Sequence, residues 1–387
     1  MKKNKKKICF LTSTRADYGL LKDLINKFKK SKNINTKIIA CGTHFSSKFG
    51  FTYRELYEDN LNIDIKIKIK ISDDSSYASS IFFSEFAKKF SRSLKKINPD
   101  LLIILGDRFE ILAAASVAVI NNVPICHLHG GESTEGLIDD SIRHAVTKLS
   151  SLHFVSHKKY KKRIIQMGEN PSNIYNVGAL GLNSIKDQSF ASIKQLEKKL
   201  NIKTKSKNII VTYHPVTLQK NTNKHIDEIL KAIKLFKEYC FIITAPNMDT
   251  EHNQIIYKLK NFAKLRKNIY YFKSLGKQKY FDTLNLCDGV MGNSSSGIIE
   301  ASSFKKGTIN IGERQKGRIQ SKSVINCKPI KKDIAKSIKK LISKKFKKSI
   351  EKIKNPYFKI NTENKILAII EKKNLENLIK KPFVDHE

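Results

Sequence analysis

Short apolar runs that end in small or polar residues alternate along this chain with segments of helical periodicity. The run at 101–107 reads LLIILGD and is almost wholly apolar, which is typical of a strand buried on both faces of a parallel sheet. A similar run at 8–14 precedes a helical segment, and a helix is predicted at 75–97 because Asn98-Pro99 stops it there. Strands that alternate with helices in this way predict a doubly wound parallel sheet.

The same alternation restarts after a polar, Lys-rich segment that follows residue 182. Further strands that run into loops are predicted at 208–215, 239–247, 268–272, 289–297 and 307–313. At 387 residues the chain is long enough for two domains, each with its own core. We therefore expect two Rossmann-like α/β domains with a central cleft, the first over residues 1–185 and the second over residues 186–360.

The composition is strongly basic, but the two basic residue types are used very unequally. Lysine and arginine total 74 against 35 acidic residues, which gives a formal net charge of +39. Only nine of the 74 are arginine, the residue that proteins favour for bidentate recognition of phosphates and bases. The lysines are spread over polar helix faces along the whole chain. We therefore do not expect nucleic-acid binding as the main function, and a rare arginine beside glycines, serines or acids indicates a specific role.

Cysteine usage and hydropathy indicate the compartment. The six cysteines, at positions 9, 41, 126, 240, 287 and 327, form no CxxC pair, so neither a disulfide framework nor a zinc site is predicted. The apolar run near the N-terminus has about five residues, too few for a signal peptide. No stretch approaches the roughly 20 apolar residues that span a membrane. We expect a cytoplasmic enzyme without membrane association.

Acids, histidines and glycines are concentrated at 127–149, which reads HLHGGESTEGLIDDSIRHAVTKL. Glu132 follows two glycines there, and Asp139 comes seven residues later, while Asp107, the aspartate of GDRFE, ends the apolar run LLIILGD. Either aspartate would also suit the N-cap of a helix. Three carboxyl groups at one sheet edge repel one another, however, and such repulsion makes a usable general acid or base near neutral pH. We therefore predict that Asp107, Glu132 and Asp139 are catalytic.

The histidines of the same stretch, His127, His129 and His144, are candidate metal ligands. Their spacing matches no strong ligand motif, and glycines interrupt the run. We therefore predict no metal site.

The strongest local signal in the second half is GNSSSGIIEA at 292–301. A predicted strand ends there in an asparagine and three serines, just before a helix whose free N–H groups and dipole favour a phosphate. Glu300, one turn into that helix, is placed to accept two hydroxyls of a ribose. A serine-rich turn without a ligand is the alternative interpretation.

Polar side chains with useful chemistry follow one predicted strand after another. They are Arg15, His44, Asp107, Glu132, His214, Asn247, Ser294 and Arg314. Because ligands of parallel α/β sheets bind beyond the carboxyl ends of the strands, this repetition predicts a site. Arg108, beside Asp107, suits an anionic ligand.

Six motifs follow one another along the chain. They are RADYG (15–19), GDRFE (106–110), HGGE with DDSIRHAVTKLS (129–150), TYHPVT (212–217), GNSSSGIIEA (292–301) and NIGERQKGR (310–318). Together they resemble the hydrolysing UDP-N-acetylglucosamine 2-epimerases, which initiate sialic acid synthesis and whose close relatives supply legionaminic acid. Each motif is weak by itself, but six in this order, over residues 8 to 320, are specific.

The resemblance implies a GT-B fold with the nucleotide on the second domain and a C-terminal helix, within 361–387, that packs back on the first domain. The implied residues are the catalytic acids Asp107, Glu132 and Asp139 and the substrate-binding residues Arg15, His44, Arg108, His214, Asn247, Ser294, Ser295, Glu300 and Arg314. Among these, Ser294 and Ser295 would hold the diphosphate and Glu300 the ribose. Arg15, His214 and Arg314 would neutralise phosphate charge.

The implied reaction eliminates UDP from the sugar nucleotide to give a 2-acetamidoglucal. Water then adds with inversion at C2 and releases N-acetylmannosamine. This chemistry requires a base against the C2 proton and donors around the departing diphosphate. Glu132 or Asp107 is the expected base, and Asp139 is expected to assist hydration. No cofactor is implied, and a homo-oligomer, either a dimer or a tetramer, is expected.

One position departs from the family pattern, and several alternatives stay open. Leu20 stands where some relatives carry a lysine, so Lys22 replaces that phosphate contact or the contact is absent. The nearest alternative substrate is UDP-N,N'-diacetylbacillosamine, whose differences at C4 and C6 could be read by residues 44–53 or 133–136. More remote alternatives are a non-hydrolysing epimerase, a GT-B glycosyltransferase and a basic nucleic-acid-binding protein.

Overall fold

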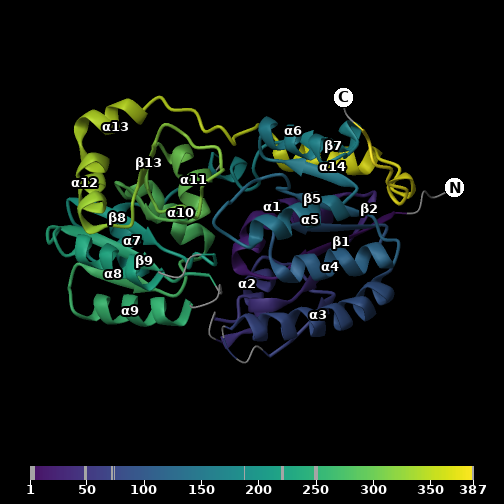
Figure 1. Ribbon diagram of the computed structural model, residues 1–387, viewed down its shortest axis with the longest axis horizontal. Coiled ribbons are helices and arrows are strands. Elements are labelled where there is room, and N and C mark those ends of the chain that lie inside the picture. Colours follow the sequence, from purple (N-terminus) through teal and green to yellow (C-terminus); the bar gives the residue numbers. More distant parts are fainter. Residues whose placement is uncertain are drawn as a thin grey trace. The chain divides into compact units, whose positions relative to one another are not determined.

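A computed structural model divides the chain into two α/β units, each built around one parallel sheet (Figure 1). Unit 1 comprises Met1–Glu132, Asp139–Ser184 and Tyr357–Glu387, and unit 2 comprises Ser133–Ile138 and Ile185–Pro356. The structure describes residues 5–47, 50–70, 73, 75–186, 188–218, 222–247 and 252–385. The predicted fold class, two parallel-sheet α/β domains of the GT-B type, is confirmed.

The sheet of unit 1 has seven strands in the order β3-β2-β1-β4-β5-β6-β7. Their bounds are β1 (Lys6–Thr12), β2 (Ile34–Ala40), β3 (Ile65–Lys66), β4 (Leu101–Leu105), β5 (Ile125–Leu128), β6 (Leu152–Val155) and β7 (Ile174–Asn176). Side chains of β1 alternate between two cores: Ile8 and Phe10 join one, and Cys9 and Leu11 join the other. Burial on both faces explains why the central strands are apolar throughout.

Helices cover both faces of this sheet. They are α1 (Arg15–Lys30), α2 (Tyr53–Glu58), α3 (Ser76–Ile97), α4 (Phe109–Ile120), α5 (Asp139–Leu149), α6 (Lys158–Gln166) and α14 (Thr362–Lys372), with short 3-10 turns η1 (Gly42–Phe45), η3 (Pro171–Asn173), η4 (Asn183–Ile185) and η6 (Glu376–Leu378). The predicted end of α3 is confirmed, since Asn98 caps it in the left-handed conformation.

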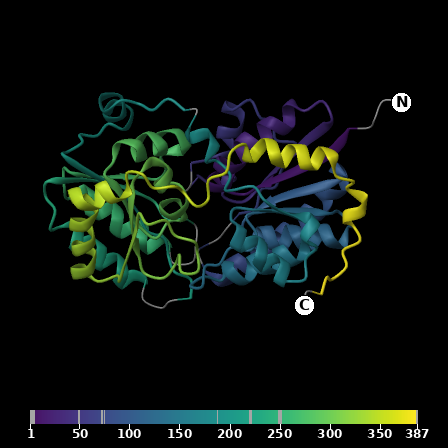
Figure 2. The ribbon, with the colours of Figure 1, turned by 90° about the horizontal axis from the view of Figure 1, so that it is seen from above.

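The C-terminal helix belongs to unit 1, although it follows unit 2 in the sequence. Helix α14, in yellow in Figure 2, packs against α1. Lys6 holds its C-terminal end, because Nζ donates to the carbonyls of Ile370, Glu371 and Lys373 at 3.0, 2.7 and 2.6 Å. A cation at a helix C-terminus satisfies the carbonyls that have no partner within the helix.

Unit 2 repeats the plan with six strands in the order β10-β9-β8-β11-β12-β13. Its strands are β8 (Lys207–Thr212), β9 (Tyr239–Thr244), β10 (Ile269–Phe272), β11 (Gly289–Gly292), β12 (Gly307–Ile311) and β13 (Val324–Cys327). Its helices are α7 (Ile193–Leu200), α8 (Thr222–Ile233), α9 (His252–Lys264), α10 (Gly276–Leu286), α11 (Ser295–Ile299), α12 (Lys331–Ile342) and α13 (Lys344–Ile350), with the turn η5 (Ala301–Phe304). In both units the polar side chains predicted from the sequence follow the carboxyl ends of the strands.

Candidate functional site

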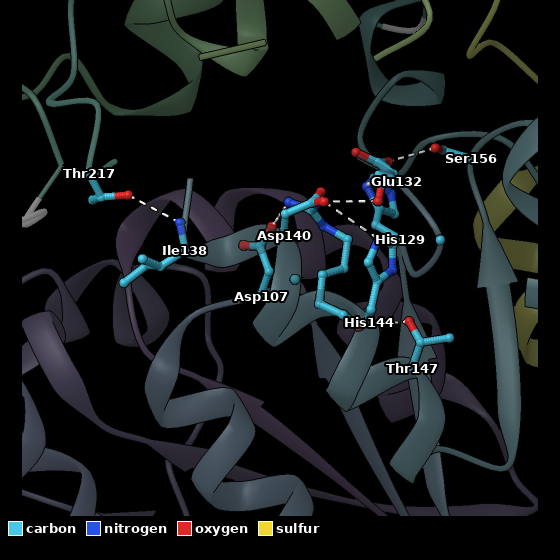
Figure 3. A network of polar contacts seen from close by, with 12 residues as sticks. Asp107, His129, Glu132, Ile138, Asp140, His144, Thr147, Ser156 and Thr217 are labelled. Carbon is cyan, nitrogen blue, oxygen red and sulfur yellow. Dashed lines mark hydrogen bonds and ion pairs between the residues drawn. The ribbon is translucent and has the colours of Figure 1, made fainter. Parts of the chain in front are cut away.

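A cluster of carboxyl groups lies at the carboxyl ends of β4 and β5 in unit 1 (Figure 3). Asp107 follows β4 and Glu132 follows β5, and these strands are neighbours in the sheet. Asp107 is not the N-cap of α4, because Arg108 occupies that position. Its side chain pairs with Arg143 instead. The aspartate therefore takes part in the cluster and not in helix capping.

Arg143 holds this cluster together from within α5. The guanidinium is buried, with 1% of the residue exposed. Nη1 donates to the carbonyl oxygen of Glu132 and to Asp140 Oδ1, both at 3.1 Å, while Nη2 donates to Asp107. The planar fork of an arginine suits these acceptors because its two terminal nitrogens donate in different directions from one rigid group. The sequence argument did not place Arg143 in the site, although the scarcity of arginine was a signal for it.

Glu132 is almost completely buried, with 2% of the residue exposed. Its Oε1 accepts a hydrogen bond from Ser156 Oγ at 2.7 Å and lies 3.5 Å from His129 Nδ1. Sequence reasoning missed Ser156, even though this serine directly follows the strand β6, as the other candidates follow theirs.

The two aspartates at the start of α5 occupy different places. Asp139 is the first residue of the helix and is half-buried. Asp140 shares Arg143 with Asp107, and its Oδ2 lies 3.6 Å from His144 Nε2. The structure thus links Asp140 to the cluster, and the catalytic role of Asp139 stays a prediction.

His127 belongs to β5, the strand that precedes Glu132. It is fully buried in β5, with Nε2 2.8 Å from the carbonyl oxygen of Gly106 and Nδ1 3.1 Å from Thr147 Oγ1. Burial lowers the pKa of His127 to about 3. The described residues hold no group of three or more histidine, cysteine or acidic side chains suited to a metal ion.

Burial of neutral His127 predicts a pH dependence of stability. An unfolded histidine binds its proton near pH 6.5, so between pH 6.5 and about 3 the unfolded state carries the extra proton. The contribution of His127 to the free energy of unfolding is therefore fully present above pH 6.5, and it falls by about 1.4 kcal/mol for each pH unit below that value. Urea unfolding at pH 7.5 and pH 5.5 measures the slope. His127→Gln should have a shallower slope, and an unchanged slope would contradict the assignment.

Three predicted substrate residues of unit 1 have these placements. The capping box of Thr14 and Asp17 starts α1 and places half-buried Arg15 in its first turn. Arg108 donates from Nε to Glu110 Oε1 at 2.8 Å. His44 is 0% exposed, and its nitrogens each lie 2.9 Å from a threonine hydroxyl. Because both ring nitrogens of His44 are occupied by threonine hydroxyls, this placement disfavours direct contact with the substrate. The substrate-binding role of His44 stays a prediction.

A second group of predicted residues meets in unit 2 around Asn293. Its Oδ1 accepts from the backbone N–H of His214 at 2.7 Å, and its Nδ2 donates to the His214 carbonyl at 2.8 Å. Arg314 Nη1 and Gln315 Nε2 both donate to the carbonyl of Asn293, at 3.3 and 2.8 Å. Asn293 therefore joins the end of β8 to that of β11 and to the loop of Arg314. Neither Asn293 nor Gln315 was among the predicted site residues.

His214 is buried beside this asparagine. Burial first, and the charge of Arg314 second, lower its pKa well below the usual value, so the ring is neutral at pH 7. The N–H of Asn247 donates to His214 Nδ1 at 2.9 Å, which leaves the ring proton on Nε2. The neutral ring of His214 can therefore donate a hydrogen bond from Nε2, and the positive charge next to it comes from Arg314.

The serine-rich motif forms the turn from β11 into α11. Ser294 is the N-cap of α11 without a side-chain capping bond, and Ser295 is the first residue of the helix. Ser296 donates to Glu300 Oε2, and its Oγ lies 2.5 Å from the hydroxyl of Tyr280. These contacts fix the direction of the Glu300 carboxylate.

Gly292 makes this turn possible. Its φ is +136°, and an added Cβ would collide with the carbonyl of Thr212, which belongs to the backbone and cannot move aside. Gly292→Ala should therefore lower the free energy of unfolding by about 3 kcal/mol. Gly19→Ala in α1 is the matched control, because a Cβ there meets nothing within 4 Å; it should gain about 0.5–1 kcal/mol. Denaturant unfolding of both variants tests this, and equal stabilities would contradict it.

Residues 133–138 leave unit 1 between Glu132 and Asp139 and belong to unit 2. The N–H of Glu135 donates to the carbonyl of Lys316 at 3.2 Å, and its carboxylate lies 3.0 Å from Lys316 Nζ. The N–H of Ile138 donates to Thr217 Oγ1 at 3.1 Å (Figure 3). The chain segment that separates two predicted catalytic acids is thus held by the loops that follow β8 and β12.

Comparisons with known proteins agree on one family. A family model described as UDP-N-acetylglucosamine 2-epimerase matches residues 26–371. A Campylobacter jejuni protein, GDP/UDP-N,N'-diacetylbacillosamine 2-epimerase (hydrolyzing), is 40% identical over 99% of this chain and 100% of its own. Polysialic acid biosynthesis protein P7 of Escherichia coli is 36% identical over 94% and 93%. The Legionella pneumophila UDP-N,N'-diacetylbacillosamine 2-epimerase (hydrolyzing) is 33% identical over 83% and 85%.

Solved structures agree on the fold. A UDP-GlcNAc 2-epimerase from Neisseria meningitidis bound to UDP-GlcNAc superposes with a TM-score of 0.82 at 17% identity, over 95% of this chain and 100% of the other. The S. aureus MnaA–UDP co-structure gives 0.80 at 18% identity, over 98% and 100%. Among the described residues no helix has the length and apolar character needed to cross a membrane.

Proposed function

Because the chain belongs to the UDP-N-acetylglucosamine 2-epimerase family, in its group of hydrolysing UDP-sugar 2-epimerases, we propose that its substrate is UDP-N,N'-diacetylbacillosamine. The similarity to the Campylobacter and Legionella enzymes, both named for that substrate, supports this choice. The sequence motifs favour UDP-N-acetylglucosamine, whereas the names of these relatives favour its alternative. Free 2-epimerised diacetamido sugar and UDP are the products.

The observation that carries the proposed reaction is the carboxyl cluster of unit 1, in which Glu132 is buried and Asp107 and Asp140 are partly exposed. Asp107 is paired with Arg143, and a carboxylate held by a guanidinium is a weak base. The Glu132 carboxylate accepts a hydrogen bond from the neutral hydroxyl of Ser156. Of the two bases that the sequence left open, we therefore assign Glu132 to the C2 proton. Asp107 and Asp140, with Asp139 as the family resemblance implies, are assigned to the hydration step.

The reaction proceeds in two steps. The proton at C2 passes to Glu132 while the bond from C1 to the UDP oxygen breaks, which leaves a C1=C2 double bond. Water then adds its oxygen to C1, and a proton is delivered to C2. This proton arrives on the face of the sugar opposite to the one from which the first proton was removed, so that the configuration at C2 is inverted. Arg314 and the Nε2–H of His214, both of unit 2, stabilise the departing diphosphate. Ser294 and Ser295 of unit 2 and Arg15 of unit 1 are assigned to the same phosphates. Glu300 is assigned to the ribose.

Aromatic side chains beside the predicted specificity segment support the diacetamido substrate. The rings of Phe45 and Tyr53 stack with their centroids 5.2 Å apart. The rings of Phe51 and Tyr57 meet that of Tyr53 edge to face, at centroid distances of 6.3 and 6.1 Å. Phe51 and Tyr57 are partly exposed, and such a surface favours the C6 methyl of this sugar over a hydroxyl. Lys48 and Phe49, which fall in the same segment, lie outside the described residues.

Proton NMR of the purified protein in D2O tests the proposal. UDP-N,N'-diacetylbacillosamine, its GDP counterpart and UDP-N-acetylglucosamine are incubated separately. The proposal predicts UDP and a free diacetamido sugar deuterated at C2, with turnover of UDP-N-acetylglucosamine at least about tenfold slower, as expected when a pocket is shaped for one substituent. Faster release of N-acetylmannosamine, or an epimerised sugar still bound to nucleotide, would overturn it.

UDP-N-acetylglucosamine is the second candidate substrate. The relative named for polysialic acid biosynthesis, at 36% identity, and a Neisseria meningitidis UDP-N-acetylglucosamine 2-epimerase, at 30%, favour it. Both candidates use the same acids and the same diphosphate ligands, so the choice concerns only the sugar. A cytoplasmic location and a homo-oligomeric assembly stay predictions.

A further inference from the structure

The carboxyl group of Glu132 is anchored by a residue from the next strand. Ser156 follows β6, which is the neighbour of β5 in the sheet. Its hydroxyl donates to Glu132 Oε1 at 2.7 Å, and both residues are buried, with 1% and 2% exposed (Figure 3). A bond to one oxygen fixes the rotation of the carboxyl group, and with it the direction of the other oxygen.

His129 lies near the same oxygen of Glu132. Its Nε2 accepts the backbone N–H of Leu180 at 3.1 Å, so a neutral ring carries its proton on Nδ1. Nδ1 is 3.5 Å from Glu132 Oε1. The backbone of His129 has φ of +64°, a conformation that non-glycine residues rarely adopt unless the surrounding contacts require it.

We propose that Ser156 and His129 are positioning residues that orient the Glu132 carboxylate and keep it ionised for removal of the C2 proton. The proposal rests on the proposed function. Both groups present a proton to Oε1, and donors to a carboxylate favour its charged form. Because the reacting groups of an enzyme must be held close to their productive geometry, loss of one anchor should slow proton transfer more than it weakens binding.

Ser156→Ala tests the proposal against Ser150→Ala. Ser150 is also buried in unit 1, with 0% exposed, but its hydroxyl donates to the carbonyl of Val146 at 2.7 Å. We expect Ser156→Ala to lower kcat about 10- to 100-fold with KM within about threefold, whereas Ser150→Ala retains kcat within about twofold. The acidic limb of the pH–rate profile should move to higher pH in Ser156→Ala only, because a carboxylate with fewer donors keeps its proton to higher pH.

A double-mutant cycle separates action through Glu132 from a structural effect. If Ser156 acts only through this carboxylate, then Glu132→Gln/Ser156→Ala should have the same residual rate as Glu132→Gln alone. Additive losses, or a Ser156→Ala variant no slower than Ser150→Ala in an active enzyme, would overturn the positioning role and leave the proposed function intact. A wild-type protein that releases no nucleotide from any of the three sugar nucleotides would instead overturn the proposed function, and the positioning role with it.

Discussion

Replacing Arg143 by methionine is expected to lower the free energy of unfolding by about 3–5 kcal/mol and to reduce turnover at least about 100-fold. The guanidinium is buried and donates to Asp107, to Asp140 and to the carbonyl oxygen of Glu132. Its removal leaves the carboxylates of Asp107, after β4, and Asp140, in the first turn of α5, without the cation that compensates their charge. The two aspartates then repel each other, and the turn that carries Glu132 loses a backbone anchor.

Two further variants make this expectation specific. Arg143→Lys keeps the charge but cannot reproduce the fork of donors, so it should recover little of the activity. Arg163→Met is the matched control, because Arg163 is half-buried and donates to the carbonyl of Gly131, one residue before Glu132. It should cost about 1 kcal/mol. Denaturant unfolding and initial rates measure all three, and an Arg143→Met protein as stable as Arg163→Met would refute the central role of Arg143.

Elements with strong local signals could be predicted from the sequence. Apolar runs located β4 and β8 because these strands are buried on both faces, and the pattern of helical periodicity located α3, whose end is set by Asn98. The division into two parallel sheets followed from the same alternation. These features depend on residues close in sequence, so no knowledge of the packing was needed.

The candidate site was predictable only as a set of strand ends. Asp107 and Glu132 follow neighbouring strands of unit 1, and His214 follows β8 of unit 2; within each unit, the topology of the parallel sheet brings such strand ends to one edge. Partners from distant parts of the chain were not predictable. Ser156 reaches Glu132 across 24 residues, and whether Asp139 or Asp140 meets Arg143 depends on the rotation of about 100° between successive helix positions.

Glu132→Gln is expected to abolish turnover, with kcat lowered by at least about 1,000-fold, because an amide cannot accept the C2 proton. The substitution preserves the shape of the side chain and an oxygen that can accept from Ser156. Stability should therefore change by less than about 1 kcal/mol. Affinity for UDP should be retained, since Glu132 is not among the residues assigned to the nucleotide. Exchange of the C2 hydrogen with D2O should be lost together with nucleotide release.

Glu169→Gln is the matched control, because Glu169 is an equally buried acid of unit 1 with a different set of partners. Burial alone would raise its pKa, but hydrogen bonds from His153, Lys381 and Lys148 outweigh that effect and lower it. Loss of its charge should reduce stability by about 1–3 kcal/mol at pH 7, with kcat within about twofold of wild type. Glu132→Gln should therefore lose turnover and keep its stability, whereas Glu169→Gln should keep its turnover and lose stability. If Glu132→Gln still exchanged the C2 hydrogen at the wild-type rate, the base would have to be another acid of the cluster, and Asp107→Asn would be the next variant to measure.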